Sequence, residues 1–330
     1  MVFSLGPFAY SLEVPNLTPA ITSYCKKMDG QFKKFGWGKS DCENINWNHV
    51  RNSVNGDPLT WTVFGDTADV DTASFKQKHV SIIMCGVHGD EITPVKFCFD
   101  ILDYLKSAYA DPEVSKSEFS KKIVIVAPLV NPDSFFKERP SRVNARGVDV
   151  NRNFPTRDWA KDARRLWMTN FRKDRRRNPG LTSNSEPEVV FQMNLIKRYG
   201  PDKIISVHSP LTMLDYDGPS KGVDSFGDGA RAHELLIQMS KDASDYKVVN
   251  YPFFPGSLGN WAGKERDIPT YTLELPSSDP AKSPEYWKLF KSAIHNAIVH
   301  GLKEKSADPK STADLEKSSE SKSINIEKLN

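Results

Sequence analysis

Residues 79–91 read HVSIIMCGVHGDE, a continuous apolar run that ends in a turn bearing a histidine and a glutamate. The run His79–Gly86 is rich in β-branched residues, which is typical of a strand buried on both faces of a sheet. A helical pattern follows over roughly Glu91–Ala108, so this stretch predicts a strand, a turn and a helix. Sites in α/β proteins form where strands end at their carboxyl edge, and His88 and Glu91 lie at such an end.

Further apolar strands and amphipathic helices alternate on both sides of this unit. The alternation predicts one α/β domain with a largely parallel sheet covered by helices. The predicted strands are Leu59–Phe64, His79–Gly86, Ile123–Ala127, Lys203–Val207 and Pro269–Leu273, and the predicted helices are Glu91–Ala108, Glu186–Arg198, Arg231–Lys241, Leu258–Arg266 and Pro284–Leu302.

The two ends of the chain depart from this pattern. Residues 1–57 contain many turn formers and aromatic residues, and they predict an irregular N-terminal lead-in to a domain over residues 58–302. Residues 303–330 are rich in Ser, Lys, Glu and Asp and contain no aromatic residue. Such a segment buries too little apolar surface to offset the entropy lost on ordering, so we predict a disordered polar tail.

Composition excludes two classes of protein. The 45 basic and 42 acidic residues leave a formal net charge of +3, which gives no electrostatic reason to expect a nucleic-acid partner. No stretch approaches the roughly 20 apolar residues that a membrane span requires. The N-terminus lacks the basic start and apolar run of a secretory signal, which favours a cytoplasmic location. If a leader was removed before this numbering, the periplasm is the alternative.

The four cysteines are too few for a disulfide scaffold at this length. Cys85 lies in the apolar strand and Cys98 in the following helix pattern, and both are interpreted as small buried hydrophobic residues. Cys25 and Cys42 could form a bridge in an oxidising compartment, and the sequence leaves that pairing open.

A second buried run also ends in a histidine. His208 follows the predicted strand Lys203–Val207, and in a parallel sheet the end of this strand can lie beside the end of His79–Gly86. A catalytic zinc takes three protein ligands and keeps one open position, and His88, Glu91 and His208 would supply that set. The His-x-x-Glu pair alone is weak evidence, and is better explained by a turn histidine and a carboxylate at a helix N-terminus.

A carboxylate ends a third apolar strand, in the sequence TYTLEL at residues 270–275. Burying Glu274 in an apolar run is costly unless it is paired or functional. Beside a metal it could accept a proton from water, and burial would raise its pKa toward a useful value. The alternative is an ion-paired structural glutamate.

A long polar stretch, residues 131–184, has little regular pattern, and a loop of that length in a compact domain is more often functional than idle. Its first part, residues 131–155, reads NPDSFFKERPSRVNARGVDVNRNFP. The planar guanidinium groups of its arginines suit recognition of a carboxylate or a developing oxyanion. A solvated basic loop is the alternative.

Taken together, these motifs resemble the carboxypeptidase A-like zinc peptidases. HGDE, NPD…RVNARGVDVNRNFP, SEPE, SVHSP and TLELP occur in the order of that family over roughly Ser81–Pro276. The resemblance implies an α/β sandwich with a mixed, mostly parallel, eight-stranded sheet, and one zinc ion per chain. It also implies zinc ligation by His88, Glu91 and His208, a general base at Glu274, carbonyl polarisation by Arg142, and receipt of the substrate's terminal carboxylate by Asn151 and Arg152.

Within this family, RVNARGVDVNRNFP, SEPE and PGSLGNWAG are most similar to the murein peptide amidase A type. That resemblance implies hydrolysis of the γ-D-glutamyl–meso-diaminopimelate bond of cell-wall peptides. Ser134 departs from the usual glycine of NPDG, and the substrate-capping tyrosine of the family has no secure counterpart, although Tyr251 lies in the right region. The basic segment Trp159–Arg177 is interpreted as a solvated helical face, with attraction of an acidic murein peptide as the alternative.

The pocket for the released side chain is expected between Leu214–Asp217 and Leu258–Trp261. There, Asp215 or Asp217 could meet the amine of diaminopimelate.

Several functions remain open at this stage. A general metallocarboxypeptidase or an LD-carboxypeptidase would use the same metal and base. An aspartoacylase-like N-acyl amino acid deacylase shares the HG-[ND]-E and Asn-Arg motifs, but NPD…NARG and TLELP favour a peptidase. An inactive scaffold that binds peptide or carbohydrate would lack a ligand or the base, and the sequence has all of them. We therefore predict a zinc-dependent hydrolase that cleaves an amide bond next to a carboxylate-bearing residue, with its oligomeric state open.

Overall fold

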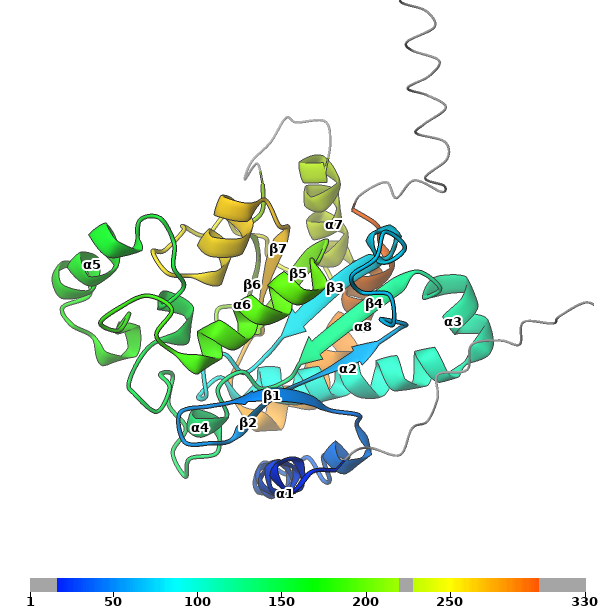
Figure 1. The fold of residues 1–330 in the computed structure, drawn as a ribbon, viewed down its shortest axis with the longest axis horizontal. Helices are drawn as coiled ribbons and strands as arrows, with labels where there is room; N and C mark the ends of the chain where they lie inside the picture. Colours follow the sequence, from blue (N-terminus) through cyan, green and yellow to red (C-terminus); the bar gives the residue numbers. More distant parts are fainter. Residues whose placement is uncertain (1–16, 220–227, 303–330) are drawn as a thin grey trace, which may run out of the picture.

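A seven-stranded sheet forms the centre of the molecule (Figure 1). The structure is a computed structural model that describes residues 17–219 and 228–302. The strand order is β1-β2-β4-β3-β5-β7-β6. The strands are β1 (Asn48–Asn52), β2 (Pro58–Phe64), β3 (His79–Met84), β4 (Lys122–Ala127), β5 (Lys203–His208), β6 (Met213–Tyr216) and β7 (Thr270–Glu274).

Helices pack on both faces of this sheet. Every helix in the described ranges is too short or too polar to cross a membrane. The α-helices are α1 (Pro19–Lys34), α2 (Ile92–Ala110), α3 (Pro112–Glu118), α4 (Pro132–Phe135), α5 (Arg164–Thr169), α6 (Pro187–Tyr199), α7 (Asp228–Asp242) and α8 (Ser283–Val299). The other helical segments include the 3₁₀ turns η3 (Val150–Arg152) and η5 (Arg175–Arg177) and the π-helical segments η4 (Trp159–Ala163) and η6 (Gly259–Lys264).

The sheet is mixed, as the family resemblance implied. β3 pairs in parallel with β4 and with β5, and β5 pairs in parallel with β7. The pairs β1–β2, β2–β4 and β6–β7 are antiparallel. The prediction of eight strands was wrong by one for the residues described. Sequence reasoning missed β1 because this edge strand reads NHVRN and is mostly exposed, without an apolar run to mark it.

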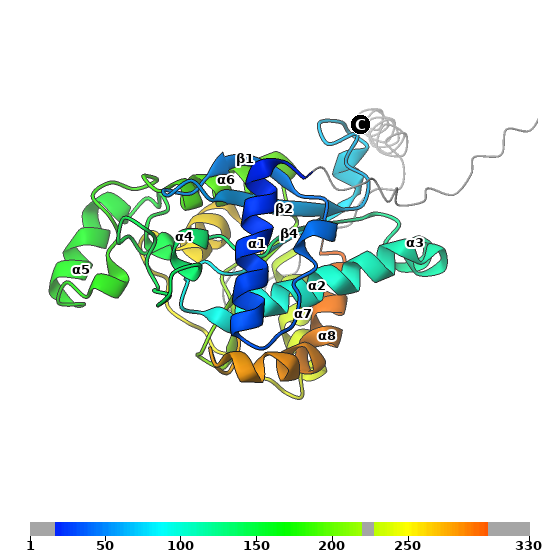
Figure 2. The same cartoon turned by 90° about the horizontal axis from the view of Figure 1, so that it is seen from below.

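The side chains of β3 alternate between two apolar layers. Val80, Ile82 and Met84 pack in the layer that includes residues of α6 and η6. Ile83 and Cys85 pack in the layer that includes residues of α1, α2, α7 and α8, which cover one face of the sheet in Figure 2. Burial on both faces accounts for the unbroken apolar run, because each fully buried aliphatic side chain contributes about 1.5–3 kcal/mol.

The N-terminal segment is more regular than its sequence suggested. α1 begins at Pro19, and the hydroxyl of Thr18 accepts a hydrogen bond from the backbone N–H of Ile21 (3.3 Å). Its buried side chains join the same apolar layer as α2 and α8. The prediction of an irregular lead-in over residues 1–57 was therefore wrong for the part that forms α1 and β1. The predicted tail, residues 303–330, lies outside the described residues.

All four cysteines are paired. Cys25 and Cys42 form a disulfide that ties α1 to the following turn, with Cα atoms 5.3 Å apart. Cys85 and Cys98 form a second one, which ties the end of β3 to α2 with Cα atoms 6.2 Å apart. Cys85 and Cys98 are buried, as interpreted from the sequence, but the bridge between them was not predicted, because it depends on the turn after β3 folding α2 back against the strand.

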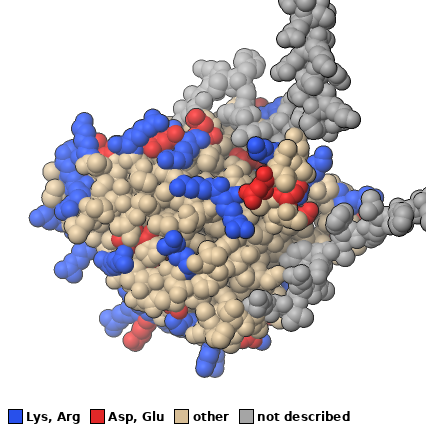
Figure 3. All heavy atoms as spheres, viewed as in Figure 1, with Lys and Arg blue, Asp and Glu red and all other residues tan. Residues whose placement is uncertain are grey.

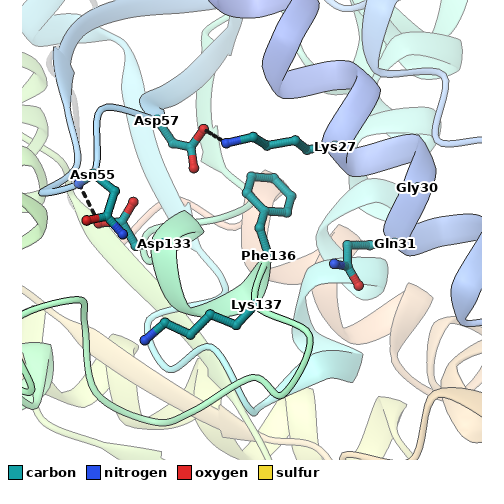
Figure 4. Close-up of a pocket in the computed structure, with 8 residues that line it drawn as sticks. All are labelled: Lys27, Gly30, Gln31, Asn55, Asp57, Asp133, Phe136 and Lys137. Carbon is teal, nitrogen blue, oxygen red and sulfur yellow. Dashed lines mark hydrogen bonds and ion pairs between the residues drawn. The ribbon is translucent and has the colours of Figure 1, made fainter.

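A cavity of about 350 Å³ lies beside α4, between α1 and the β1–β2 turn (Figure 4). Lys27 and Asp57 form an ion pair at one side of it, with Nζ and Oδ1 2.5 Å apart. None of the predicted site residues contributes to the walls of this cavity. The predicted site lies instead at the carboxyl edge of the sheet. The lining residues are Lys27, Gly30, Gln31, Asn55, Asp57, Asp133, Phe136 and Lys137.

Replacing both Cys25 and Cys42 with alanine should lower the free energy of unfolding by about 3 kcal/mol. The reason is that this disulfide restricts a loop with a sequence separation of 17 residues in the unfolded chain. Urea denaturation followed by circular dichroism measures the change. An unchanged free energy of unfolding would show that these cysteines are not paired in solution; a Cys85→Ala/Cys98→Ala variant tests the second bridge in the same way.

Candidate functional site

Three neighbouring parallel strands bring the predicted site residues to one edge of the sheet. Met84, at the end of β3, pairs with Ser206 of β5, and His208 pairs with Glu274 of β7. His88 follows β3 by one short turn, so it lies at the same edge. The expectation that these strand ends lie side by side is confirmed.

His88, Glu91 and His208 converge on one point. Nδ1 of His88 lies 2.7 Å from Oε1 of Glu91, and Nδ1 of His208 lies 2.9 Å from Oε2 of the same carboxylate. One ligand atom from each residue lies within 4.8 Å of the others, and all three residues are buried. Two imidazole nitrogens and a carboxylate oxygen are a donor set that zinc prefers, so these residues fit a zinc ion.

Both histidines are held by their second ring nitrogen. Nε2 of His88 lies 3.1 Å from Oδ1 of Asp149, and Nε2 of His208 lies 2.9 Å from the hydroxyl of Ser206. Such partners fix the ring orientation and leave Nδ1 for a metal. Sequence reasoning missed Asp149; its signal was a carboxylate inside the GVDVNRN motif, but only the fold brings it to His88.

The turn between His88 and Glu91 leaves no space for a side chain at Gly89. A Cβ atom there would lie 2.5 Å from Cβ of Ser134 and 2.7 Å from the backbone nitrogen of Phe135. The metal turn therefore packs directly on α4. Ser134, the departure from the family's NPDG motif, hydrogen-bonds through its hydroxyl to the backbone oxygen of Ser141 (2.7 Å).

Arg142 connects Glu91 and Asp149. Its Nε donates to Oδ2 of Asp149 (2.9 Å), and its Nη1 donates to Oε1 of Glu91 (3.2 Å). Burial opposes ionisation of both carboxyl groups, but their neighbours hold both pKa values well below their usual range. These neighbours are His88 and His208 for Glu91, and Arg142 with His88 for Asp149. Both carboxylates are thus ionised at neutral pH.

Glu274 lies beside this group, with 8% of its surface exposed. Its Oε2 accepts a hydrogen bond from the backbone N–H of Leu211 (3.2 Å). Burial raises the pKa of Glu274, and His208 partly opposes the rise. This direction agrees with the expectation from sequence for a carboxylate that accepts a proton near neutral pH.

Asn151 and Arg152 lie on η3, just after Asp149. Oδ1 of Asn151 accepts a hydrogen bond from the N–H of Leu258 (2.8 Å). Nη1 of Arg152 donates to the backbone oxygen of Asn151 (2.6 Å), whereas its buried Nε has no hydrogen-bond partner among the described residues. Burial lowers the pKa of Arg152 to about 10, and Arg142 and Arg177 add to this effect. A cation with unused donors suits a carboxylate ligand.

Asp215 and Asp217, the two aspartates expected in the pocket for the released side chain, lie in different surroundings. Asp215 is buried and accepts a hydrogen bond from the backbone N–H of Tyr251 (3.0 Å), so it holds that segment in place. The half-buried Asp217 lies against Gly259, where a Cβ atom would come within 2.4 Å of its carboxyl group. Tyr251 itself lies close to Phe254, with ring centroids 5.9 Å apart, and the Arg152 guanidinium covers the Phe254 ring at 4.4 Å.

A second pair of buried carboxylates, Glu186 and Glu188, contacts the loop between Arg142 and Asp149. Nδ2 of Asn144 donates to Glu186 (2.7 Å) and to Glu188 (3.0 Å). Its side-chain oxygen, Oδ1, accepts from the backbone N–H groups of Arg146 and Val148. Oε1 of Glu188 is buried without a partner in the described chain. Burial raises the pKa of Glu188 to about 7. This pair fixes the turn that connects Arg142 with Asp149.

Comparison with known sequences identifies relatives of this chain. The family model described as zinc carboxypeptidase matches residues 41–290. Murein peptide amidase A of Escherichia coli K12 is 30% identical over 253 residues, which cover 76% of this chain and 88% of that protein. The corresponding protein of Vibrio campbellii is 30% identical over 197 residues, covering 59% of this chain and 68% of its own.

Solved structures agree with the fold. The crystal structure of murein-tripeptide amidase from Escherichia coli O157 matches with a TM-score of 0.50 and 25% identity, covering 78% of this chain and 93% of that one. Bovine thrombin-activatable fibrinolysis inhibitor, solved with a tick carboxypeptidase inhibitor, matches with a TM-score of 0.59 and 18% identity. That match covers 84% of this chain and 95% of the bovine one, and it supports the fold alone.

Asp149→Asn should weaken zinc binding about 10–100-fold, because the variant removes the charged partner that orients His88. Competition with a chromophoric chelator measures the affinity. Asp162→Asn, which changes a carboxylate paired only with Arg165 in the described chain, is the matched control. Equal affinities of the two variants would contradict a role of Asp149 at the metal centre.

Glu188→Gln should change how stability depends on pH. Between the ordinary pKa of 4.5 and the raised value of about 7, the folded chain keeps a proton that the unfolded chain releases. The free energy of unfolding should therefore fall by up to about 3 kcal/mol as pH rises through this window, and level off above it.

Glu188→Gln should lack this contribution. Its free energy of unfolding should therefore rise relative to that of the parent between about pH 5 and pH 8. Urea denaturation of the zinc-loaded proteins at several pH values measures it, with the exposed Glu285→Gln as control. Parallel curves for the parent and Glu188→Gln would exclude proton uptake at this site.

Proposed function

Since the chain belongs to the zinc carboxypeptidase family, and is thus a zinc-dependent metallopeptidase, we propose that it is a murein peptide amidase. The bond cleaved would be the γ-D-glutamyl–meso-diaminopimelate amide. The observation that carries this choice is the 30% identity to murein peptide amidase A over 88% of that relative's length. The three-residue metal group supports it, together with the buried Arg152 Nε, which has no partner among the described residues.

His88, Glu91 and His208 hold the zinc in this proposal. Bound zinc polarises the scissile carbonyl and lowers the pKa of water. The orientation of both Nδ1 atoms toward Glu91 supports this assignment, because the second ring nitrogens are occupied by Asp149 and Ser206.

Glu274 is the general base in the proposed mechanism. It removes a proton from the attacking water and later gives it to the departing amine. Its raised pKa favours both directions of transfer near neutral pH. Arg142, fixed by Glu91 and Asp149, donates to the oxygen on which negative charge develops.

Asn151 and Arg152 bind the carboxylate of the residue that is released. The buried Nε of Arg152, which has no hydrogen-bond partner in the described part of the chain, supports this role, since a carboxylate would satisfy it. Binding of a free carboxylate restricts cleavage to the end of a peptide. Of the two aspartates considered from sequence, Asp215 is a poor candidate for the diaminopimelate amine, because it is buried and already accepts the backbone N–H of Tyr251.

The two disulfides favour an oxidising compartment, such as the periplasm, over the cytoplasmic location expected from the sequence. This location is part of the proposal, because peptidoglycan peptides are accessible there.

The substrate is tested by mass spectrometry of the products formed by zinc-loaded protein. L-Ala-γ-D-Glu-meso-diaminopimelate, ordinary L-peptides and N-acyl amino acids are the three kinds of substrate, and we expect cleavage of the first alone, with release of diaminopimelate. Cleavage only of ordinary C-terminal residues would assign a general metallocarboxypeptidase. Release of amino acids only from N-acyl derivatives would assign a deacylase.

Glu274→Gln should retain zinc but lose at least about a thousandfold in kcat, because the variant lacks a proton acceptor at the required place. His208→Ala should instead lose zinc. Metal analysis and kinetics of both variants separate the two roles. A Glu274→Gln protein with near-normal turnover would remove Glu274 as the base.

A further inference from the structure

The segment Trp159–Arg177 carries eight basic and two acidic residues. In Figure 3, Lys and Arg side chains gather at the end of the molecule where α5 lies. The sequence favoured a solvated helical face for this segment. Arg164, Arg165 and, in the last turn η5, Arg175 and Arg176 are exposed, as that interpretation expects. Arg176 differs in that it also contacts a residue outside the segment.

Arg176 attaches η5 to the metal turn. Its Nη1 donates to Oδ2 of Asp90 at 2.5 Å, and Asp90 stands between His88 and Glu91 in the sequence. Asp90 is also one of the carboxylates that raise the pKa of Arg142, against the effect of burial. The C-terminal end of the basic segment is therefore fixed at the edge of the site.

Arg177 and Arg152 each cover one ring of an aromatic pair, Phe171 and Phe254. The Arg177 guanidinium covers the ring of Phe171 at 4.6 Å, and the Phe171 and Phe254 rings are 6.5 Å apart. The Arg152 guanidinium covers Phe254 at 4.4 Å. Arg152 and Arg177 line one small cavity with these rings, and the charge of Arg177 contributes to the lowered pKa of Arg152.

Within the described residues, neither guanidinium is hydrogen-bonded to a carboxylate, although Asp149 acts on Arg152 at longer range. The acidic partner of Arg177 is Asp174, at 3.8 Å, which is beyond hydrogen-bonding distance. Arg152 keeps a buried Nε without a partner in the described part of the chain. Two arginines that line the same cavity repel each other unless anions lie between or beside them. A single terminal carboxylate satisfies Arg152 and leaves Arg177 available for another anionic group.

We propose that Arg177 determines specificity by binding a second carboxylate of the substrate, while Arg152 binds the terminal one. This inference rests on the proposed function and extends it to the substrate's charge. In a murein peptide, the second carboxylate has two possible sources. One is the α-carboxylate of the γ-linked D-glutamate, and the other is the distal carboxylate of diaminopimelate.

The test compares Arg177→Gln with Arg172→Gln, an exposed residue of the same segment that controls for loss of net charge. The substrates are L-Ala-γ-D-Glu-meso-diaminopimelate, the same peptide with the D-glutamate α-carboxylate amidated, and L-Ala-γ-D-Glu-L-Lys, which lacks the distal carboxylate. Arg177→Gln should lower kcat/KM on the first substrate on the order of tenfold, mainly through KM, while Arg172→Gln leaves it almost unchanged.

The parent enzyme should cleave the substrate that lacks the relevant carboxylate with a lower kcat/KM. Arg177→Gln should not lower kcat/KM on that substrate any further. This pattern identifies which carboxylate Arg177 binds. An equal loss on all three substrates, or no loss on any, would overturn the inference.

If the proposed function is wrong, the parent enzyme does not cleave murein peptides, and this result differs from every outcome above. The comparison then uses ordinary peptides that differ by Glu or Gln at the last or the penultimate residue. A preference for Glu that disappears in Arg177→Gln supports the inference. A preference that persists, or its absence in the parent, overturns it.

Discussion

The carboxylate of Glu91, buried between two imidazole rings, is the constraint on which the rest of the site depends. A buried charge is costly unless it is paired, and here His88, His208 and Arg142 all contact it. These partners come from the turn after β3, from the end of β5 and from the polar loop. Three segments distant in sequence must therefore meet at one point, and the parallel pairing of β3 with β5 makes this possible.

The surrounding structure keeps these partners in place. Asp149 joins His88 to Arg142, and the buried Asn144–Glu186–Glu188 group holds the turn that leads from Arg142 to Asp149. The Cys85–Cys98 disulfide joins the strand and the helix that flank the metal turn. The long polar loop is thus fixed by its own hydrogen bonds at several points, which is how a segment with little regular secondary structure can carry functional side chains in defined positions.

The sequence predicted the central strands and the metal group because both leave local signals. Buried strands such as His79–Met84 are continuous apolar runs, and His88, His208 and Glu274 stand at or just after the ends of such runs. The polar edge strand β1 left no such signal. Asp149 was missed because its role depends on a contact across 61 residues, and the Cys85–Cys98 bridge was missed because it depends on how α2 folds back on β3. The basic segment was interpreted from its charge alone, whereas its contacts with Asp90 and Phe171 are set by the tertiary fold.

X-ray absorption spectroscopy of the zinc-loaded protein tests the central claim most directly, namely that His88, Glu91 and His208 bind the metal. We expect a zinc shell with two imidazole nitrogens at about 2.0–2.1 Å, together with oxygen ligands, and the loss of one imidazole in a His208→Ala sample if it is reloaded at high zinc concentration. A shell without imidazole, or one that the His208 substitution does not change, would contradict the account.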